Sequence, residues 1–306
     1  GNIFLDDIPA GRVKVLSDEW WTLVEHAIRE GGRTGVGIGM FNCPGWSQSG
    51  GPWIEPSQAM RYLVSSETRV TGPARFEGKL PAPKEPFQQV AVAAFPAPRA
   101  DEDAIGAGTA RVSCTPAAAG VERLLDGALD TEFAFPRNAG RGANAFTIDI
   151  ELPEAACARS LALYPTGAPW AGACELQAAG SDGAFARVRA FNFDRSNMSV
   201  NVGPMPRGPA AVSFPATTAK RWRLVFSGVS HQGALAEIRL SGAARLEHFV
   251  EKQLGKMHPT PLPMWDTYLW PAQAEPEAKD LAVAAAAVQD LARAVSPDGT
   301  LRWDVP

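Results

Sequence analysis

The feature that most limits the fold is a long middle region, residues 109–242, where apolar and polar residues alternate over short stretches between turn-forming residues. Residues 145–150, 160–164 and 221–226 are clear examples. Alternation with a period of two predicts a strand with one buried face, and several such strands in succession are typical of a β-sandwich. The 29 glycines and 26 prolines also favour a loop-rich β protein over a helical bundle. We therefore expect residues 105–243 to form a sandwich.

The N-terminal residues predict an α/β structure instead. A short strand is expected at 12–16, and Ser17-Asp18-Glu19 is a capped helix start whose helix runs to the glycine pair 31–32. A buried strand over 36–41 and a helix from Glu55-Pro56-Ser57 follow. This is a piece of a parallel β/α fold, because a complete barrel needs about 250 residues.

The expected fold class is thus α/β plus all-β. We expect a partial (β/α) barrel segment over 1–72, a linking β region over 73–104 and the sandwich over 105–243. A return helix and extended segment over 244–306 would lead toward the barrel or a further β domain. Residues 278–294 are rich in alanine and predict a helix, and the last residues predict a turn and a strand. A strand at this position suggests that the natural protein continues beyond Pro306.

Composition excludes several classes of partner and site. The formal charge of −4 gives no general attraction to nucleic acid, and no apolar run is long enough to span a membrane. The four cysteines are too widely spread for a zinc ribbon and too few for a disulfide scaffold. Gly45-Trp46-Ser47-Gln48-Ser49 lacks the closing glycine of a hydrolase nucleophile elbow, and Gly37-Ile38-Gly39 lacks the third glycine of a dinucleotide motif.

A loop over residues 42–54 combines indole rings with amide and hydroxyl groups directly after the strand expected at 36–41. Trp46 and Trp53 offer flat apolar faces suited to the C–H surface of a pyranose, while Asn42 and Ser47 offer hydrogen-bonding groups for its hydroxyls. These four residues are the predicted substrate-binding set. The alternative is a structural loop whose tryptophans fill the core.

The same loop carries a resemblance to a known family. Residues 41–54, Phe-Asn-Cys-Pro-Gly-Trp-Ser-Gln-Ser-Gly-Gly-Pro-Trp-Ile, resemble glycoside hydrolase family 106, the α-L-rhamnosidases, as do Asp18-Glu19-Trp20-Trp21 and residues 298–306. The resemblance implies a large enzyme whose N-terminal β/α barrel is interrupted by β-sandwich domains. It also implies an inverting, calcium-dependent removal of terminal rhamnose from oligo- or polysaccharides, by an enzyme exported to the periplasm or secreted.

As one of the β-sandwich domains that this resemblance implies, residues 105–243 resemble a discoidin-like or family 32 carbohydrate-binding sandwich, of the galactose-binding-like jelly-roll type. The similarity lies in residues 124–131, 176–183, 218–224 and 235–238. Many such sandwiches hold a structural calcium ion, and the matching oxygen ligands here are Asp126, Asp130, Thr131 and Glu237. The alternative is an Asp-Gly turn beside a surface glutamate. The sandwich could bind glycans itself, as a non-catalytic module, or be purely structural; Trp170, Phe191 and Phe193 are its few loop aromatics.

Inverting hydrolysis requires one carboxyl group as acid and another that activates water. Glu19, Glu55 and Glu67 are the glutamates near the barrel piece, and helix starts account for the first two. The resemblance places the catalytic carboxylates beyond Pro306, so their identity is unknown. A calcium ion is also expected in the complete catalytic site, and this chain alone is predicted to be inactive.

Overall fold

The computed structural model of the chain describes residues 11–39, 54–58, 61–82, 87–98, 104–106, 108–136, 145–196, 198, 205, 207–230, 232–252, 273 and 281–306. The chain divides into two compact units, residues 1–60 and 61–306. The described part is mostly β, with open sheets and one helix longer than two turns. None of its helices is long and apolar enough to cross a membrane.

The first unit contains the long helix α1, Asp18–Thr34. Its start is the predicted one, because the Ser17 hydroxyl accepts a hydrogen bond from the Trp20 N–H at 3.2 Å. Its end lies beyond the glycine pair, at Gly35, which adopts a left-handed conformation. Gly31 remains inside the helix because the chain folds back there: a Cβ atom at this position would lie 2.6 Å from the Ile38 side chain.

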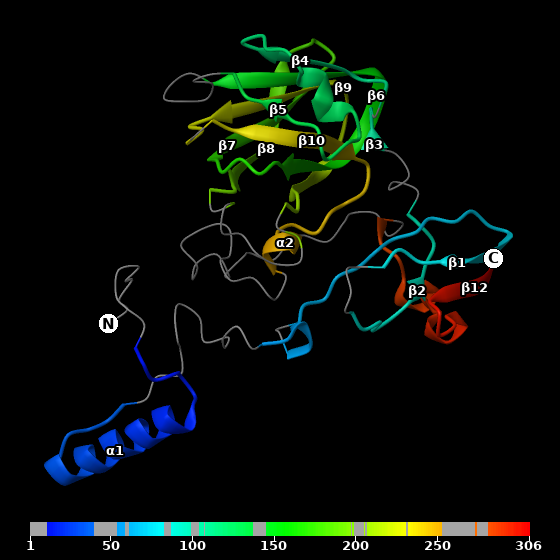
Figure 1. Cartoon of the computed structure of the whole chain (residues 1–306). Helices are drawn as coiled ribbons and strands as arrows, with labels where there is room; N and C mark the ends of the chain where they lie inside the picture. Colours follow the sequence, from blue (N-terminus) through cyan, green and yellow to red (C-terminus); the bar gives the residue numbers. More distant parts are fainter. Residues whose placement is uncertain are drawn as a thin grey trace. The chain divides into compact units, whose positions relative to one another are not determined.

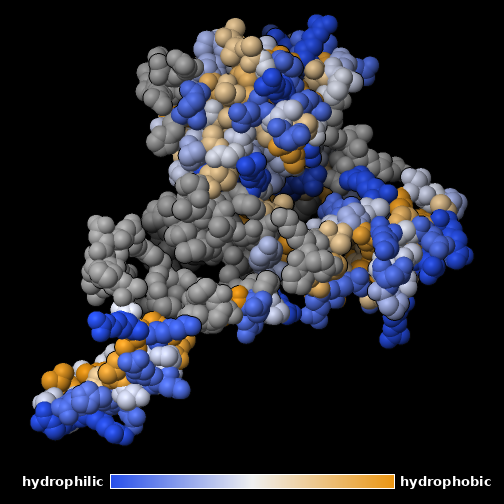
Figure 2. Space-filling model, viewed as in Figure 1, coloured by the Kyte–Doolittle hydropathy of each residue, from blue (hydrophilic) through white to orange (hydrophobic). Residues whose placement is uncertain are grey.

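Helix α1 is amphipathic and exposes much of its apolar surface. Trp21, Leu23 and Ile28 are 49%, 51% and 46% exposed, and Figure 2 shows hydrophobic residues gathered along one side of the helix. Trp21 and Ile28 are seven residues apart and so lie on the same side. Within α1, only Gly31 is buried.

The sandwich follows in the second unit (Figure 1). Its strands are β3 (Ala104–Ile105), β4 (Arg111–Thr115), β5 (Phe133–Ala134), β6 (Phe146–Pro165), β7 (Ala171–Ala179), β8 (Phe185–Asp194), β9 (Ala210–Ser227) and β10 (Ala234–Ser241). A short 3-10 helix, η3 (Val121–Leu125), connects β4 to β5.

Two long strands, β6 and β9, take part in both layers of the sandwich. The first part of β6 pairs with β4 and with the end of β9, next to β7 and β8. The last part of β6 pairs with β10 and with the start of β9. Irregularities in the β6–β9 register separate these two regions. The stretches predicted as separate strands at 145–150 and 160–164 therefore belong to one continuous strand.

An apolar core fills the space between the layers. Phe146 and Phe226 stack with ring centroids 4.7 Å apart, and Leu161, Leu163 and Ile238 are almost fully buried around them. These residues recur at alternate positions of their strands, as the period-two pattern predicts. A β-sandwich is therefore present, as predicted, with strands from β3 to β10.

Two short strand pairs join the chain before the sandwich to the chain after it. Strand β1 (Ala74–Lys79) pairs antiparallel with β12 (Thr300–Val305), as Figure 1 also shows. Strand β2 (Ala93–Ala94) pairs with β11 (Gln289–Asp290). The sandwich is thus an insertion within a β segment whose two halves lie far apart in the sequence.

Several local predictions outside the sandwich were wrong. The described residues of 278–294 contain 3-10 turns at Ala285–Ala287 and Ala292–Ala294 and strand β11 instead of a helix, because pairing with β2 overrides the local helix propensity of alanine. Residues 12–16 form turns, and 36–39 lie outside any strand. Where a helix was expected from Glu55, the described residues contain the 3-10 turn η1, Pro56–Gln58, and no helix over 61–64. The expected return helix after residue 244 is present as the short helix α2, Phe249–Lys252.

Candidate functional site

The predicted sugar-binding residues Asn42, Trp46, Ser47 and Trp53 lie outside the described residues. Their role stays a prediction from the sequence. The predicted calcium ligands, by contrast, are all within the described part of the sandwich and can be placed.

Asp126 lies in a tight turn directly after η3. Leu124, in the last turn of η3, is fully buried and fixes the start of this loop on the core. One Asp126 oxygen accepts a hydrogen bond from the Ala128 N–H at 2.8 Å, and the other accepts from the Thr131 hydroxyl at 2.9 Å. Gly127 has a φ of 80°, which favours glycine at this point of the turn. The loop thus holds the Asp126 carboxylate in a defined orientation.

Glu237 projects from β10 toward the same loop and is only 3% exposed. Its Oε2 atom accepts a hydrogen bond from the Gly127 N–H at 3.3 Å, although the two residues are 110 positions apart. Burial raises the pKa of Glu237 to about 7, and the nearby charge of Asp126 adds to this rise. The Gly127 N–H and the Arg239 guanidinium oppose it. Glu237 is therefore a buried acid whose charge is only partly balanced.

The fold brings together three of the four predicted ligands, Asp126, Thr131 and Glu237. Asp130 is exposed, and among the described interactions of this site none involves its side chain. Across the described residues, no group of three or more histidine, cysteine or acidic side chains could hold a metal ion. A hard cation bound here would have two carboxylates and would need the Thr131 hydroxyl and backbone carbonyls as further ligands, which calcium accepts.

Sequence reasoning missed Arg239, the residue that faces Glu237. Its Nε lies 3.7 Å from Glu237 Oε1, and its guanidinium carbon lies 4.7 Å from the centre of the Tyr164 ring. Residues two apart on a strand share a face, so the sequence Glu237-Ile238-Arg239 indicates that the arginine lies beside the glutamate. The arginine supplies positive charge close to a buried carboxylate.

The loop aromatics considered for sugar binding belong mainly to the core. Trp170 and Phe193 are 0% and 1% exposed and stack on each other with ring centroids 4.0 Å apart. Phe191 is half-buried. Neither Trp170 nor Phe193 therefore presents a ring face to a glycan.

The three glutamates weighed as catalytic groups are all exposed. Glu19 lies in the first turn of α1, where the helix dipole favours a negative charge. Glu55 precedes η1, and Glu67 lies in a segment without regular structure. Nothing in the described geometry brings two of them together as an acid and base pair.

Comparison with known proteins identifies the chain's relatives. The family profile of glycoside hydrolase family 106, described as alpha-L-rhamnosidase, matches residues 1–306. A Formosa agariphila protein with a provisional β-glucuronidase name is 40% identical over 94 residues, which are 30% of this chain and 8% of that protein.

Among solved structures, a rhamnosidase from Novosphingobium sp. PP1Y matches 98% of this chain at 21% identity and a TM-score of 0.64. The match covers 27% of that enzyme's chain, so this sequence corresponds in length to about a quarter of it. A family 32 carbohydrate-binding module from Clostridium perfringens, solved in complex with galactose, matches 45% of this chain at 16% identity and a TM-score of 0.37. The match covers 96% of that module.

Proposed function

The chain belongs to glycoside hydrolase family 106, the α-L-rhamnosidases, and on that basis we propose that it is part of an enzyme that removes terminal α-L-rhamnose from oligo- or polysaccharides. The observation that carries this proposal is the family match over residues 1–306. The fold similarity to the Novosphingobium rhamnosidase supports it. We further propose that this enzyme acts in the periplasm or outside the cell.

In this proposal the first 72 residues contribute a segment of a β/α barrel. The amphipathic helix α1 supports this, because barrel helices turn an apolar stripe toward the strands and α1 leaves Trp21 and Ile28 exposed. The inserted sandwich is of the galactose-binding-like type in the same proposal. Hydrolysis follows the inverting route, with both carboxylates supplied from outside this chain.

An activity assay tests the proposal directly. The complete enzyme that contains this chain is expected to hydrolyse 4-nitrophenyl α-L-rhamnoside and to release β-L-rhamnose first, as nuclear magnetic resonance of the fresh product would show. The chain alone is expected to release no 4-nitrophenol. Because of the name carried by the Formosa relative, 4-nitrophenyl β-D-glucuronide serves as the competing substrate. Preference for the glucuronide would reject the rhamnosidase assignment.

The loop over residues 42–54, the tryptophan loop, supplies the sugar contacts in this proposal. In the complete enzyme, Trp46→Ala and Trp53→Ala are each expected to raise KM about tenfold, because each removes an apolar platform for the sugar ring. Trp46→Phe and Trp53→Phe keep an aromatic face and are the matched controls, with a change of less than about threefold expected. Alanine variants with an unchanged KM would show that these indoles do not contact the sugar.

We also propose a structural calcium ion at the loop of Asp126. Asp126, Thr131 and Glu237 would hold it, with Asp130 as a further candidate. The support is the buried, partly balanced charge of Glu237 next to Asp126, which a divalent cation would neutralise. A bound ion would link the loop after η3 to β10. The calcium ion expected in the complete catalytic site, from the family resemblance, is a separate proposal.

A further inference from the structure

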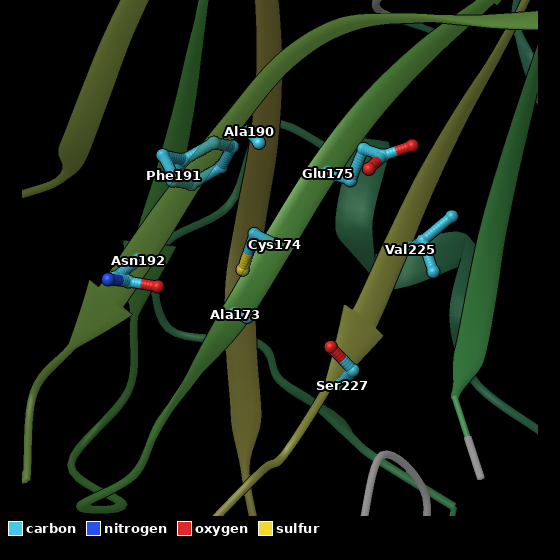
Figure 3. A pocket seen from close by; sticks show the side chains of 8 residues that line it. All are labelled: Ala173, Cys174, Glu175, Ala190, Phe191, Asn192, Val225 and Ser227. Atoms are coloured by element: carbon cyan, nitrogen blue, oxygen red, sulfur yellow. The ribbon is translucent and has the colours of Figure 1, made fainter. Parts of the chain in front are cut away.

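The outer face of β7, β8 and β9 contains a depression of about 390 Å³, and Figure 3 shows its lining side chains on these neighbouring strands. Ala173 pairs with Ser227 on one side and Asn192 on the other, and Glu175 pairs with Val225 and Ala190. Cross-strand partners carry their side chains on the same face of a sheet, so these six residues share one face. Cys174 lies between Ala173 and Glu175 on β7 and is buried, but it and its cross-strand partner Phe191 also contribute to the lining.

The shape of the depression follows from the small residues at its centre. Ala173 and Ala190 are exposed, and their methyl groups leave a hollow that longer neighbours surround. The size lies within the range of small-ligand sites, which begins at about 300 Å³. The small side chains of Ala173 and Ala190 thus leave room for a ligand on this face of the sheet.

The polar groups around the hollow are set up to bind hydroxyls. Glu175 accepts hydrogen bonds at 2.7 Å from Gln177 Nε2 and from Arg187 Nε, one on each oxygen. The bond from Gln177 lowers the pKa of Glu175, and Arg187 lowers it further, so the group is an ionised acceptor at neutral pH. Asn192, on the neighbouring strand, is exposed and offers both donors and an acceptor.

We propose that this depression binds one neutral sugar residue of a glycan chain. Glu175 accepts hydrogen bonds from sugar hydroxyls, Asn192 and Ser227 donate and accept at the two sides, and Val225 contacts the C–H groups. The Glu175 carboxylate in the lining disfavours an anionic sugar. A protein partner fits less well, because no large apolar side chain within β7, β8 or β9 is strongly exposed to anchor one.

The inference goes beyond the proposed hydrolysis, since it concerns a second sugar contact far in the sequence from the tryptophan loop. Calorimetric titration of the chain with methyl α-L-rhamnoside and methyl β-D-galactoside tests it, with methyl β-D-glucuronide as the anionic comparison. At least one neutral glycoside is expected to bind, and at least about tenfold more tightly than the glucuronide. No binding by either neutral glycoside would overturn the proposal, as would tighter binding of the glucuronide.

Variants locate the site. Ala173→Phe fills the hollow and is expected to abolish binding, whereas Ala155→Phe, at an exposed alanine of β6 outside the depression, is the matched control and leaves binding intact. Asn192→Ala and Ser227→Ala are each expected to weaken binding roughly threefold to tenfold. If Ala173→Phe does not fold, Asn192→Ala decides. Wild-type affinity in these variants would overturn the assignment.

The double variant Trp46→Ala, Trp53→Ala separates this site from the proposed substrate loop. The proposed depression predicts that this variant still binds the neutral glycoside. Binding lost in the double variant but kept in Ala173→Phe would place the sugar at the tryptophan loop and reject the depression. Binding kept in the double variant and lost in Ala173→Phe supports the depression whatever the outcome of the hydrolysis assay.

Discussion

Replacing Trp170 by alanine is expected to lower the free energy of unfolding of the sandwich by about 4 kcal/mol. The indole is fully buried, stacks on Phe193, and meets the Phe135 ring edge-on with centroids 4.9 Å apart. Its Nε1 donates a hydrogen bond to the Ala234 carbonyl at 3.0 Å. The substitution therefore leaves a cavity and an unpaired buried carbonyl together. Urea unfolding followed by far-ultraviolet circular dichroism measures the loss.

Trp21→Ala is the control for this prediction, because it removes the same side chain from a position that is 49% exposed. Its expected effect on unfolding is below about 0.5 kcal/mol. A Trp170→Ala chain that unfolds like the wild type would contradict the buried aromatic cluster. It would also return Trp170 to the set of residues available for sugar binding.

Glu237→Gln is expected to change how stability depends on pH and calcium. The pKa of Glu237 is raised to about 7 in the folded chain from an ordinary value of 4.5. Folding therefore favours the protonated form of Glu237. The stability that this protonated side chain contributes is fully present below about pH 4.5 and is lost as the pH rises to about 7. Without divalent cations the wild type should lose up to about 3 kcal/mol across this range, and Glu237→Gln should not.

Calcium should reverse this trend only where Glu237 is present. Above pH 7 the ionised carboxylate can bind the cation, so millimolar calcium chloride is expected to raise the midpoint of thermal unfolding of the wild type. Glu122→Gln, at an exposed glutamate of η3, is the matched control and should respond like the wild type. Equal stabilisation of the Glu237→Gln chain would show that calcium binds elsewhere.

The start of α1 could be predicted from the sequence because its determinants are local. Ser17, Asp18 and Glu19 act within one turn of the helix. The end of α1 could not be predicted, because Gly31 lies inside the helix at a point where the Ile38 side chain approaches closely. This approach depends on how the chain turns back after the helix. A glycine pair alone does not distinguish a helix end from a site of close approach.

The sandwich was predictable and its strand connections were not. Alternation marks each buried face, so residues such as Ile148 and Leu224 are recognisable as core. The pattern does not reveal that β6 runs unbroken through both layers, or that Phe76 on β1 pairs with Trp303 on β12. Such pairings depend on contacts between distant residues, which single-sequence periodicity does not carry.

For the candidate cation site, the sequence identified the acidic residues and the structure supplied their environment. The turn that holds Asp126 follows from the Asp-Gly pair, which is a local signal. The approach of Gly127 to Glu237 depends on packing of η3 against β10 and has no local signal. Burial of Glu237 is a property of the folded sandwich alone.

The antiparallel pairing of Ala93–Ala94 with Gln289–Asp290 holds side by side the two ends of a stretch of chain that contains the sandwich and the residues after it. A stretch attached through adjacent ends can be gained, lost or replaced in a single recombination event, because its host strands need not move. Related chains with a different passenger at this junction, or with a bare hairpin, are therefore an evolutionary outcome that this architecture permits.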